Sequence, residues 1–162
     1  MTLLLDRRSI LISMAAIAAS TNVVLAQETV HTVEMLTKHP EDKKQRNIFL
    51  PLIQVSEPGE TIFFKPTDKS HNSESIKGMI PDGAEPWKSK INKEYSLTLT
   101  QPGIYGYRCT PHAALGMVGL IIVRGDGMTD NLEAAKAVKQ RGKAKKVWEQ
   151  IWAQVESENL LA

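Results

Sequence analysis

Short apolar or β-branched segments, separated by turn residues, fill most of this chain up to residue 123. Pro and Gly mark the turns, as in Glu57-Pro58-Gly59 and Gln101-Pro102-Gly103. Many short strands spaced in this way are typical of a β-sandwich or barrel. The predicted strands are 29–36, 49–55, 61–64, 95–100, 104–109 and 118–123. The last of these is almost continuously apolar, as in a strand that is buried on both faces.

The pattern changes after Gly125-Asp126-Gly127. A segment rich in Ala, Leu, Glu and Lys predicts a helix over 131–140, capped by Asp130 and ended by Gly142. Over 143–156 the apolar residues follow helical spacing and form one stripe, which predicts an amphipathic helix. We expect this helix to pack on the sandwich; a helix that binds a partner is the alternative. The segment 78–90 is predicted to be a loop.

The first 26 residues have the order of a secretory signal peptide: Arg7-Arg8, an apolar run over 10–19, and a small-residue cleavage site at Val24-Leu25-Ala26. The apolar run is too short to span a bilayer as a helix. A retained membrane anchor is the alternative. The arginine pair is compatible with twin-arginine export, and the general secretory route stays open. Residues 27–162 would then form the exported protein, a single domain with a helical extension.

Charge and cysteine content exclude some classes of function. The formal net charge is +2, which argues against bulk binding to nucleic acid, since that needs a strongly basic surface. The single Cys109 permits no intramolecular disulfide. In an exported protein a leftover cysteine indicates intermolecular pairing or a special thiol, and a thiolate held by a metal is a third option.

Three soft donors lie within nine residues: Cys109, His112 and Met117. A second imidazole is available from His71. A Cys with two His in a plane, and a weak axial Met, is the donor set of copper sites that carry electrons. We treat the other two histidines, His31 and His39, as surface residues.

The spacing of these donors has a physical basis. In a strand over 104–109, Tyr105, Tyr107 and Cys109 share one face and Arg108 points the other way. Pro111 would end the strand and stiffen the turn that carries His112. Gly116 would give the backbone freedom to bring Met117 back to the same ion.

Zinc and nucleophilic catalysis are the rival interpretations. Zinc sites use Cys, His or carboxylate ligands, and a thioether is not among the usual ones. A Cys–His hydrolase needs a third group that orients the base, and the sequence around Cys109 offers none. We therefore predict that the protein is not an enzyme and has no catalytic residues.

Cys109-Thr110-Pro111-His112, followed by Gly116-Met117, resembles the copper loop of the cupredoxins, the small blue copper proteins. The resemblance is closer to the pseudoazurins, through the stretches 68–77, 79–85, 88–92 and 100–103. It implies an all-β fold, an eight-stranded Greek-key β-sandwich over 27–125 with two C-terminal α-helices over 126–162. It also implies one type-1 copper ion, with His71, Cys109 and His112 as strong ligands and Met117 as the axial ligand. Asn72 matches a position that hydrogen-bonds between the ligand loops.

The resemblance further implies a monomeric electron carrier in the bacterial periplasm, with an acidic redox protein as its transient partner. A copper nitrite reductase or another denitrification enzyme is the expected partner. The electron would pass at His112, within an apolar collar of Pro111, Ala113, Ala114 and Leu115. A basic ring would steer the partner; the matching residues are Lys38, Lys69, Lys77, Lys88 and Arg108. Ordinary solvated side chains are the alternative interpretation of the ring.

Residues 113–115 depart from the bulkier residues common in the family, so His112 is expected to be less covered. A copper-binding or copper-delivery protein is the alternative function. Such proteins usually have many exposed Met and His ligands, whereas the candidate ligands here are few.

Overall fold

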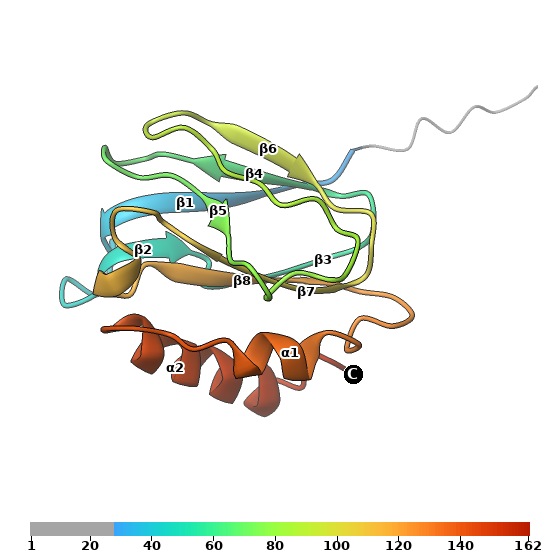
Figure 1. The fold of residues 1–162 in the computed structure, drawn as a ribbon. Helices are drawn as coiled ribbons and strands as arrows, with labels where there is room; N and C mark the ends of the chain where they lie inside the picture. The colour runs from blue at the N-terminus through green and yellow to red at the C-terminus, as the bar shows by residue number, and fades with distance from the viewer. Residues whose placement is uncertain (1–27) are drawn as a thin grey trace, which may run out of the picture.

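The computed structural model describes residues 28–162 and has two packed β-sheets with two helices on one outer face (Figure 1). Within these residues one sheet has the order β2-β1-β4-β6 and the other the order β3-β8-β7-β5. The strands are β1 (Val30–Lys38), β2 (Arg46–Leu50), β3 (Ile53–Ser56), β4 (Thr61–Lys65), β5 (Glu74–Ser75), β6 (Tyr95–Thr98), β7 (Gly103–Arg108) and β8 (Val118–Val123). The predicted eight-stranded sandwich with two C-terminal helices is therefore confirmed.

Strands β7 and β8 separate two apolar layers. On one face Tyr105, Tyr107 and Cys109 pack with Ile121 in the core between the sheets. The alternate residues, such as Ile104, face the helices. Every residue of β8 is buried, as its continuous apolar sequence predicts, because both of its faces are covered.

The predicted single strand over 49–55 is wrong. The structure divides it into β2 and β3, with Pro51 between them. Proline lacks an amide hydrogen and interrupts the hydrogen-bond ladder. As a result β2 pairs antiparallel with β1, whereas β3 pairs in parallel with β8 in the other sheet. The chain crosses between the sheets at this point.

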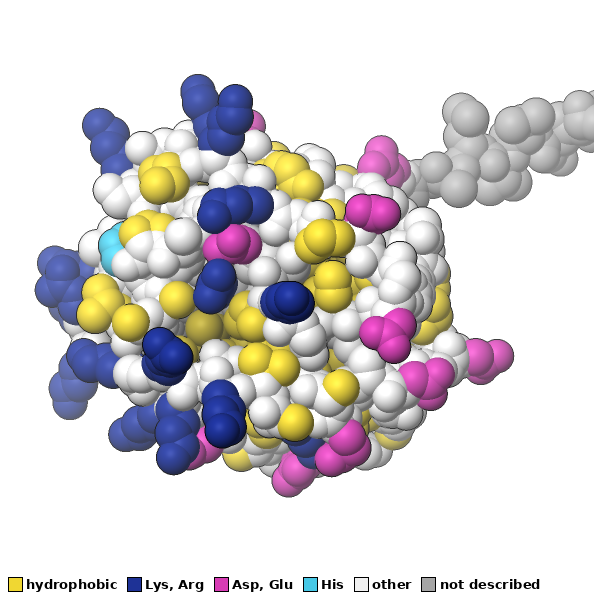
Figure 2. All heavy atoms as spheres, in the orientation of Figure 1, with side chains coloured by type: hydrophobic (Ala, Val, Ile, Leu, Met, Phe, Trp, Pro, Cys, Tyr) yellow, Lys and Arg dark blue, Asp and Glu magenta, His cyan; other side chains and the backbone are white. Residues whose placement is uncertain are grey.

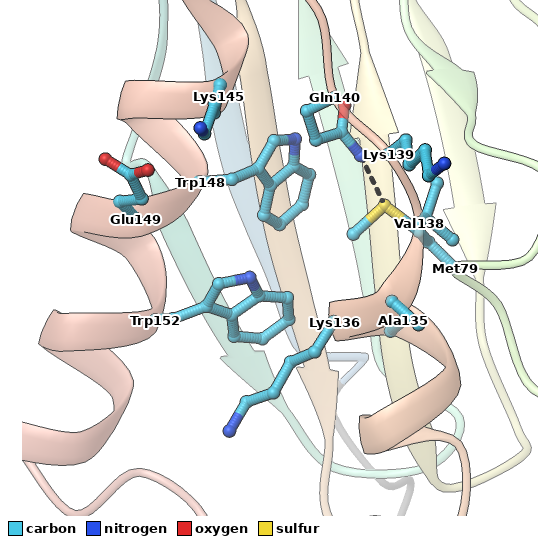
Figure 3. Close-up of a pocket in the computed structure, with 11 residues that line it drawn as sticks. Met79, Ala135, Lys136, Val138, Lys139, Gln140, Lys145, Trp148, Glu149 and Trp152 are labelled. Atoms are coloured by element: carbon cyan, nitrogen blue, oxygen red, sulfur yellow. Dashed lines mark hydrogen bonds between the residues drawn. The ribbon is translucent and has the colours of Figure 1, made fainter.

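The helices α1 (Leu132–Ala137) and α2 (Ala144–Ser157) cover the β7–β8 face. In α2 the predicted apolar stripe is buried at Ala144, Trp148, Ile151 and Val155, because it packs on the sheet. The Trp148 and Trp152 rings stack with their centroids 5.4 Å apart, and Lys136 Nζ of α1 lies over the Trp152 ring. Figure 3 shows these three side chains between α1 and α2. The apolar stripe of α2 therefore packs on the protein's own sheet, as expected, and does not form an exposed face for a partner.

Asp130 does not cap α1, contrary to the sequence-based prediction. Asn131 precedes the helix, and its side chain bonds Ile104 of β7 in both directions, over 3.0 and 2.8 Å. The cap position thus ties the helix to the sheet. In the predicted loop over 78–90, Trp87 is buried and its indole N–H donates to Ser73 Oγ.

The proposed signal peptide, 1–26, lies outside the described residues. Among residues 28–162 the structure contains no helix with the length and apolar character needed to cross a membrane.

Candidate metal centre

The loop between β7 and β8 carries three of the four candidate ligands. Cys109 directly follows β7, His112 precedes a short 3₁₀ helix (Ala113–Leu115), and Met117 precedes β8. Backbone bonds close the loop: His112 N–H donates to Cys109 O, Met117 N–H to His112 O, and Cys109 N–H to Met117 O. Gly116 has a φ of 101°, a conformation that glycine adopts without steric cost. The loop is therefore tight because each candidate ligand is bonded to another through the backbone.

His71 comes from a different part of the chain. It lies in the loop between β4 and β5, and its side chain is fully buried. Its Nε2 lies 3.2 Å from Thr37 Oγ1, within hydrogen-bond distance, and its Nδ1 lies on the side of the Cys109 loop. A metal bound at Nδ1 would leave the proton on Nε2, where Thr37 Oγ1 can accept it. The sequence did not single out Thr37.

Three donor atoms converge on one point. The Nδ1 atoms of His71 and His112 are 3.1 Å apart, and Cys109 Sγ lies 3.8 Å from the first and 3.6 Å from the second. A point equidistant from the three atoms lies about 2 Å from each, which is close to the metal–nitrogen and metal–sulfur bond lengths in proteins. Among the described residues this is the one such group of His, Cys or carboxylate donors. All three donor atoms could therefore hold one metal ion.

The electrostatics of the site favour a bound cation. Burial raises the pKa of the Cys109 thiol, and the backbone N–H groups of Asn72 and His112 act in the opposite direction. Burial also lowers the pKa of His71, and the nearby His112 adds to that effect while Asp68 opposes it. A neutral His71 is a metal ligand, and a buried thiolate needs a positive charge beside it. A soft metal ion supplies that charge.

Met117 is fully buried in the same apolar core as Cys109. A thioether is a ligand for soft ions such as copper and is not among the usual ligands of zinc. Its presence in this tight loop distinguishes the donor set from a structural zinc site.

Asn72 joins the two ligand-bearing segments. Its Oδ1 accepts the backbone N–H of Thr110 over 2.8 Å, and its Nδ2 donates to Thr110 Oγ1 over 3.0 Å and to Ser89 O over 3.1 Å. Asn72 follows His71, and Thr110 follows Cys109. The spacing between the His71 loop and the Cys109 loop is therefore fixed by one buried amide.

The C-terminal helix supports the outer side of the metal loop. Lys143 N–H donates to Ala114 O over 2.9 Å. At Gly142, with a φ of +59°, a Cβ would lie 2.5 Å from the same carbonyl oxygen, and a Cβ on Gly116 would lie 3.1 Å from Val147. Close backbone contact between the start of α2 and the loop thus requires glycine at position 142.

Around the loop the surface is apolar at its centre and basic at its edge. His112 and Ala113 are half-buried, Pro111 and Ala114 are exposed, and Leu115 is 49% exposed. Lysine and arginine side chains gather at the end of the molecule that carries this loop, and acidic ones gather at the opposite end (Figure 2).

The residues expected in the basic ring differ in their contacts. Lys38, Lys69 and Lys77 are exposed. Lys88 and Arg108 instead form ion pairs with Glu74, over 3.1 and 3.2 Å. The sequence reasoning missed Glu74, because β5 has two residues and shows no alternation.

Comparison with known proteins agrees with this structure. A family model described as copper binding proteins of the plastocyanin/azurin family matches residues 49–124. Together with the sandwich and the donor triangle, this match defines the chain as a cupredoxin whose cofactor is copper.

The particular family follows from the relatives. A pseudoazurin of Paracoccus pantotrophus is 46% identical over 145 residues, which are 88% of this chain and 97% of the relative. The crystal structure of pseudoazurin from Methylobacterium extorquens AM1 is 40% identical, with a TM-score of 0.72 over 78% of this chain and 98% of that one. A pseudoazurin from Hyphomicrobium denitrificans is 36% identical, with a TM-score of 0.71 and the same coverage. The chain belongs to the pseudoazurins, which are copper-containing electron carriers.

Proposed function

We propose that this protein carries single electrons in the periplasm, with His71, Cys109 and His112 as the strong copper ligands and Met117 as the axial ligand. The convergence of the three donor atoms, 3.1–3.8 Å apart, carries the proposal. When bound, copper supplies a Cu(I)/Cu(II) couple that transfers one electron. Residues 1–26 would direct export and be removed.

The protein residues contribute rigidity and exclusion of water. Asn72 and the backbone bonds of the 109–117 loop hold the donors at fixed separations. Side chains whose orientation is fixed by such neighbours do not need to rearrange when charge changes at the site. Because His71, Cys109 and Met117 are fully buried, water does not reach three of the four candidate ligands. Their burial also argues against copper delivery, which requires exchangeable ligands.

His112 is the proposed route for the electron. It is half-buried and lies beside Pro111, Ala113 and Ala114. A small apolar surface permits a partner to come close and leave quickly, as in transient redox complexes of less than about 1,200 Å².

Copper addition to the purified protein tests the ligand set. We expect Cu(II) to produce an intense thiolate-to-copper band in the visible spectrum. Cys109→Ser and His71→Gln should abolish the band, whereas Met117→Leu should retain copper with altered colour and potential. His39→Gln is the matched control, since His39 lies in the β1–β2 loop and bonds the amides of Glu41 and Asp42. An unchanged band in Cys109→Ser would refute the proposed site.

The proposed partner is an acidic redox protein such as a copper nitrite reductase. Support comes from the excess of lysine and arginine at the copper end (Figure 2). Charge complementarity raises encounter rates and is screened by salt. Electron transfer to the partner should therefore slow as ionic strength rises, while transfer to a neutral small oxidant should not. If the rate of electron transfer to the partner does not depend on salt concentration, the basic side chains do not steer the partner.

A further inference from the structure

Glu74 contacts both the metal loop, at Thr110, and two residues of the expected basic ring, Lys88 and Arg108. It is the first residue of β5, opposite Arg108 of β7, and it forms an isolated β-bridge with Lys88. Its side chain is only 17% exposed. Its carboxylate accepts three bonds: from Thr110 Oγ1 over 2.9 Å, from Arg108 Nε over 3.2 Å and from Lys88 Nζ over 3.1 Å. One carboxylate thus holds two cations and one hydroxyl.

The hydroxyl connects Glu74 to the ligands. Thr110 Oγ1 donates to Glu74 and accepts from Asn72 Nδ2, so both hydrogen-bonding roles of this hydroxyl are occupied. The same Thr110 donates its backbone N–H to Asn72 Oδ1. Because Thr110 adjoins Cys109 and Asn72 adjoins His71, a change at Glu74 reaches both ligand-bearing segments through one side chain.

The negative charge of Glu74 also reduces the net positive charge of the basic ring. Burial raises the pKa of this carboxyl, but the bonds from Thr110, Lys88 and Arg108 outweigh it, and the net pKa is lowered. The group is therefore ionised at neutral pH. It offsets one of the two positive charges that Arg108 and Lys88 would otherwise present. A partly buried charge acts more strongly on its neighbours than a solvated one.

We propose that Glu74 is a positioning residue of the electron-transfer site, which holds Thr110 against the ligand loops and moderates the docking charge of Arg108 and Lys88. The proposal rests on the proposed function. A negative charge near the copper site stabilises the oxidised ion, so Glu74 lowers the reduction potential. By neutralising part of the ring it also keeps the transient complex weak.

Reduction potentials of copper-loaded variants test the charge effect. Glu74→Gln should raise the potential more than Glu133→Gln does, because the control removes the same charge from an exposed position on α1. Glu74→Asp keeps the charge and should remain closer to the wild type. Electron transfer from Glu74→Gln to an acidic partner should depend more steeply on ionic strength. Equal potential shifts in Glu74→Gln and Glu133→Gln would overturn the proposal.

Amide hydrogen exchange of the copper-free protein tests the positioning effect separately. Glu74→Gln should speed exchange at Thr110 by about tenfold, since a charge-assisted bond to its side chain is lost. Exchange at Ile104, whose amide bonds Asn131, should be unchanged. If Glu74→Gln does not fold, the same comparison is made with Glu74→Asp, which should show a smaller increase. Unchanged exchange at Thr110 in the variant that folds would overturn the inference even if the wild type takes up copper. Absence of a copper band in the wild type would instead refute the proposed function.

Discussion

Tyr105 and Tyr107 lie on the same face of β7, but only the hydroxyl of Tyr105 has a hydrogen-bond partner among the described residues. Replacing each tyrosine by phenylalanine should therefore change the stability in opposite directions. Tyr105 Oη donates to the carbonyl of Gln101 over 2.7 Å. Tyr107 Oη is fully buried and has no hydrogen-bond partner within residues 28–162. Burial raises the pKa of both phenols, that of Tyr105 to about 12. Both groups therefore keep their protons, and only one proton has an acceptor.

The expected magnitudes follow from that difference. A buried hydroxyl without a partner costs about 1–3 kcal/mol. Tyr107→Phe removes this cost and leaves a void of roughly one atom, worth about 0.3–0.5 kcal/mol. The net result should be an increase of about 1–2 kcal/mol in the free energy of unfolding. Tyr105→Phe should lower it by about 1 kcal/mol, since a made bond is lost.

Urea unfolding of the copper-free proteins measures both effects, with an unchanged m-value as the check that only stability has altered. Thermal midpoints should move in opposite directions, by about 3–5 °C per kcal/mol for a domain of this size. A loss of stability in Tyr107→Phe would refute the reasoning, because it would mean that the hydroxyl is satisfied.

Three further predictions concern the packing and hydrogen bonds around the site. Gly119→Ala should lower the free energy of unfolding by about 1–3 kcal/mol in urea titrations, because its Cβ would lie 2.4 Å from Tyr107 Cζ; an unchanged midpoint would contradict it. Asn72→Ala should weaken copper binding about 10–100-fold in competition titrations with a chelator, because Thr110 loses both of its bonds to Asn72; wild-type affinity would be the opposing result. The lowered pKa of Glu74 stabilises the fold above its ordinary value of 4.5, and this contribution is lost as pH falls through the lower folded-state pKa. Unfolding free energies measured between pH 6 and 3 should therefore fall less steeply in Glu74→Gln than in the wild type, and parallel curves would argue against it.

The sequence allowed prediction of features that depend on local pattern. Cys109, His112 and Met117 are close in the chain, so their convergence follows from one strand end and one turn. The strand β8 was evident from its continuous apolar residues, and the face of α2 from its period. The donor chemistry of His71 was enough to predict it as a partner of Cys109. Its position in the loop after β4 was not predicted.

Features that depend on the tertiary arrangement were not predictable in the same way. The apolar run over 49–55 gave no sign that Pro51 separates two strands of different sheets. The Asn131 side chain bonds the backbone of Ile104 in β7 and makes no cap bond to its own helix. Which of these bonds it makes depends on the position of Ile104 in the folded protein. Glu74 joins residues that are 14 to 36 positions away in sequence, which no local periodicity records.

The bond from Lys143 to Ala114 and the close contact at Gly142 make the metal loop depend on a distant part of the sequence. The segment that supports the outer side of the 109–117 loop follows all four candidate ligands in the chain. A polypeptide that stops before residue 142 would contain all four candidate ligands but lack their external support. Such a fragment should therefore hold the 109–117 loop less firmly than the whole chain does, although it contains the same four donors.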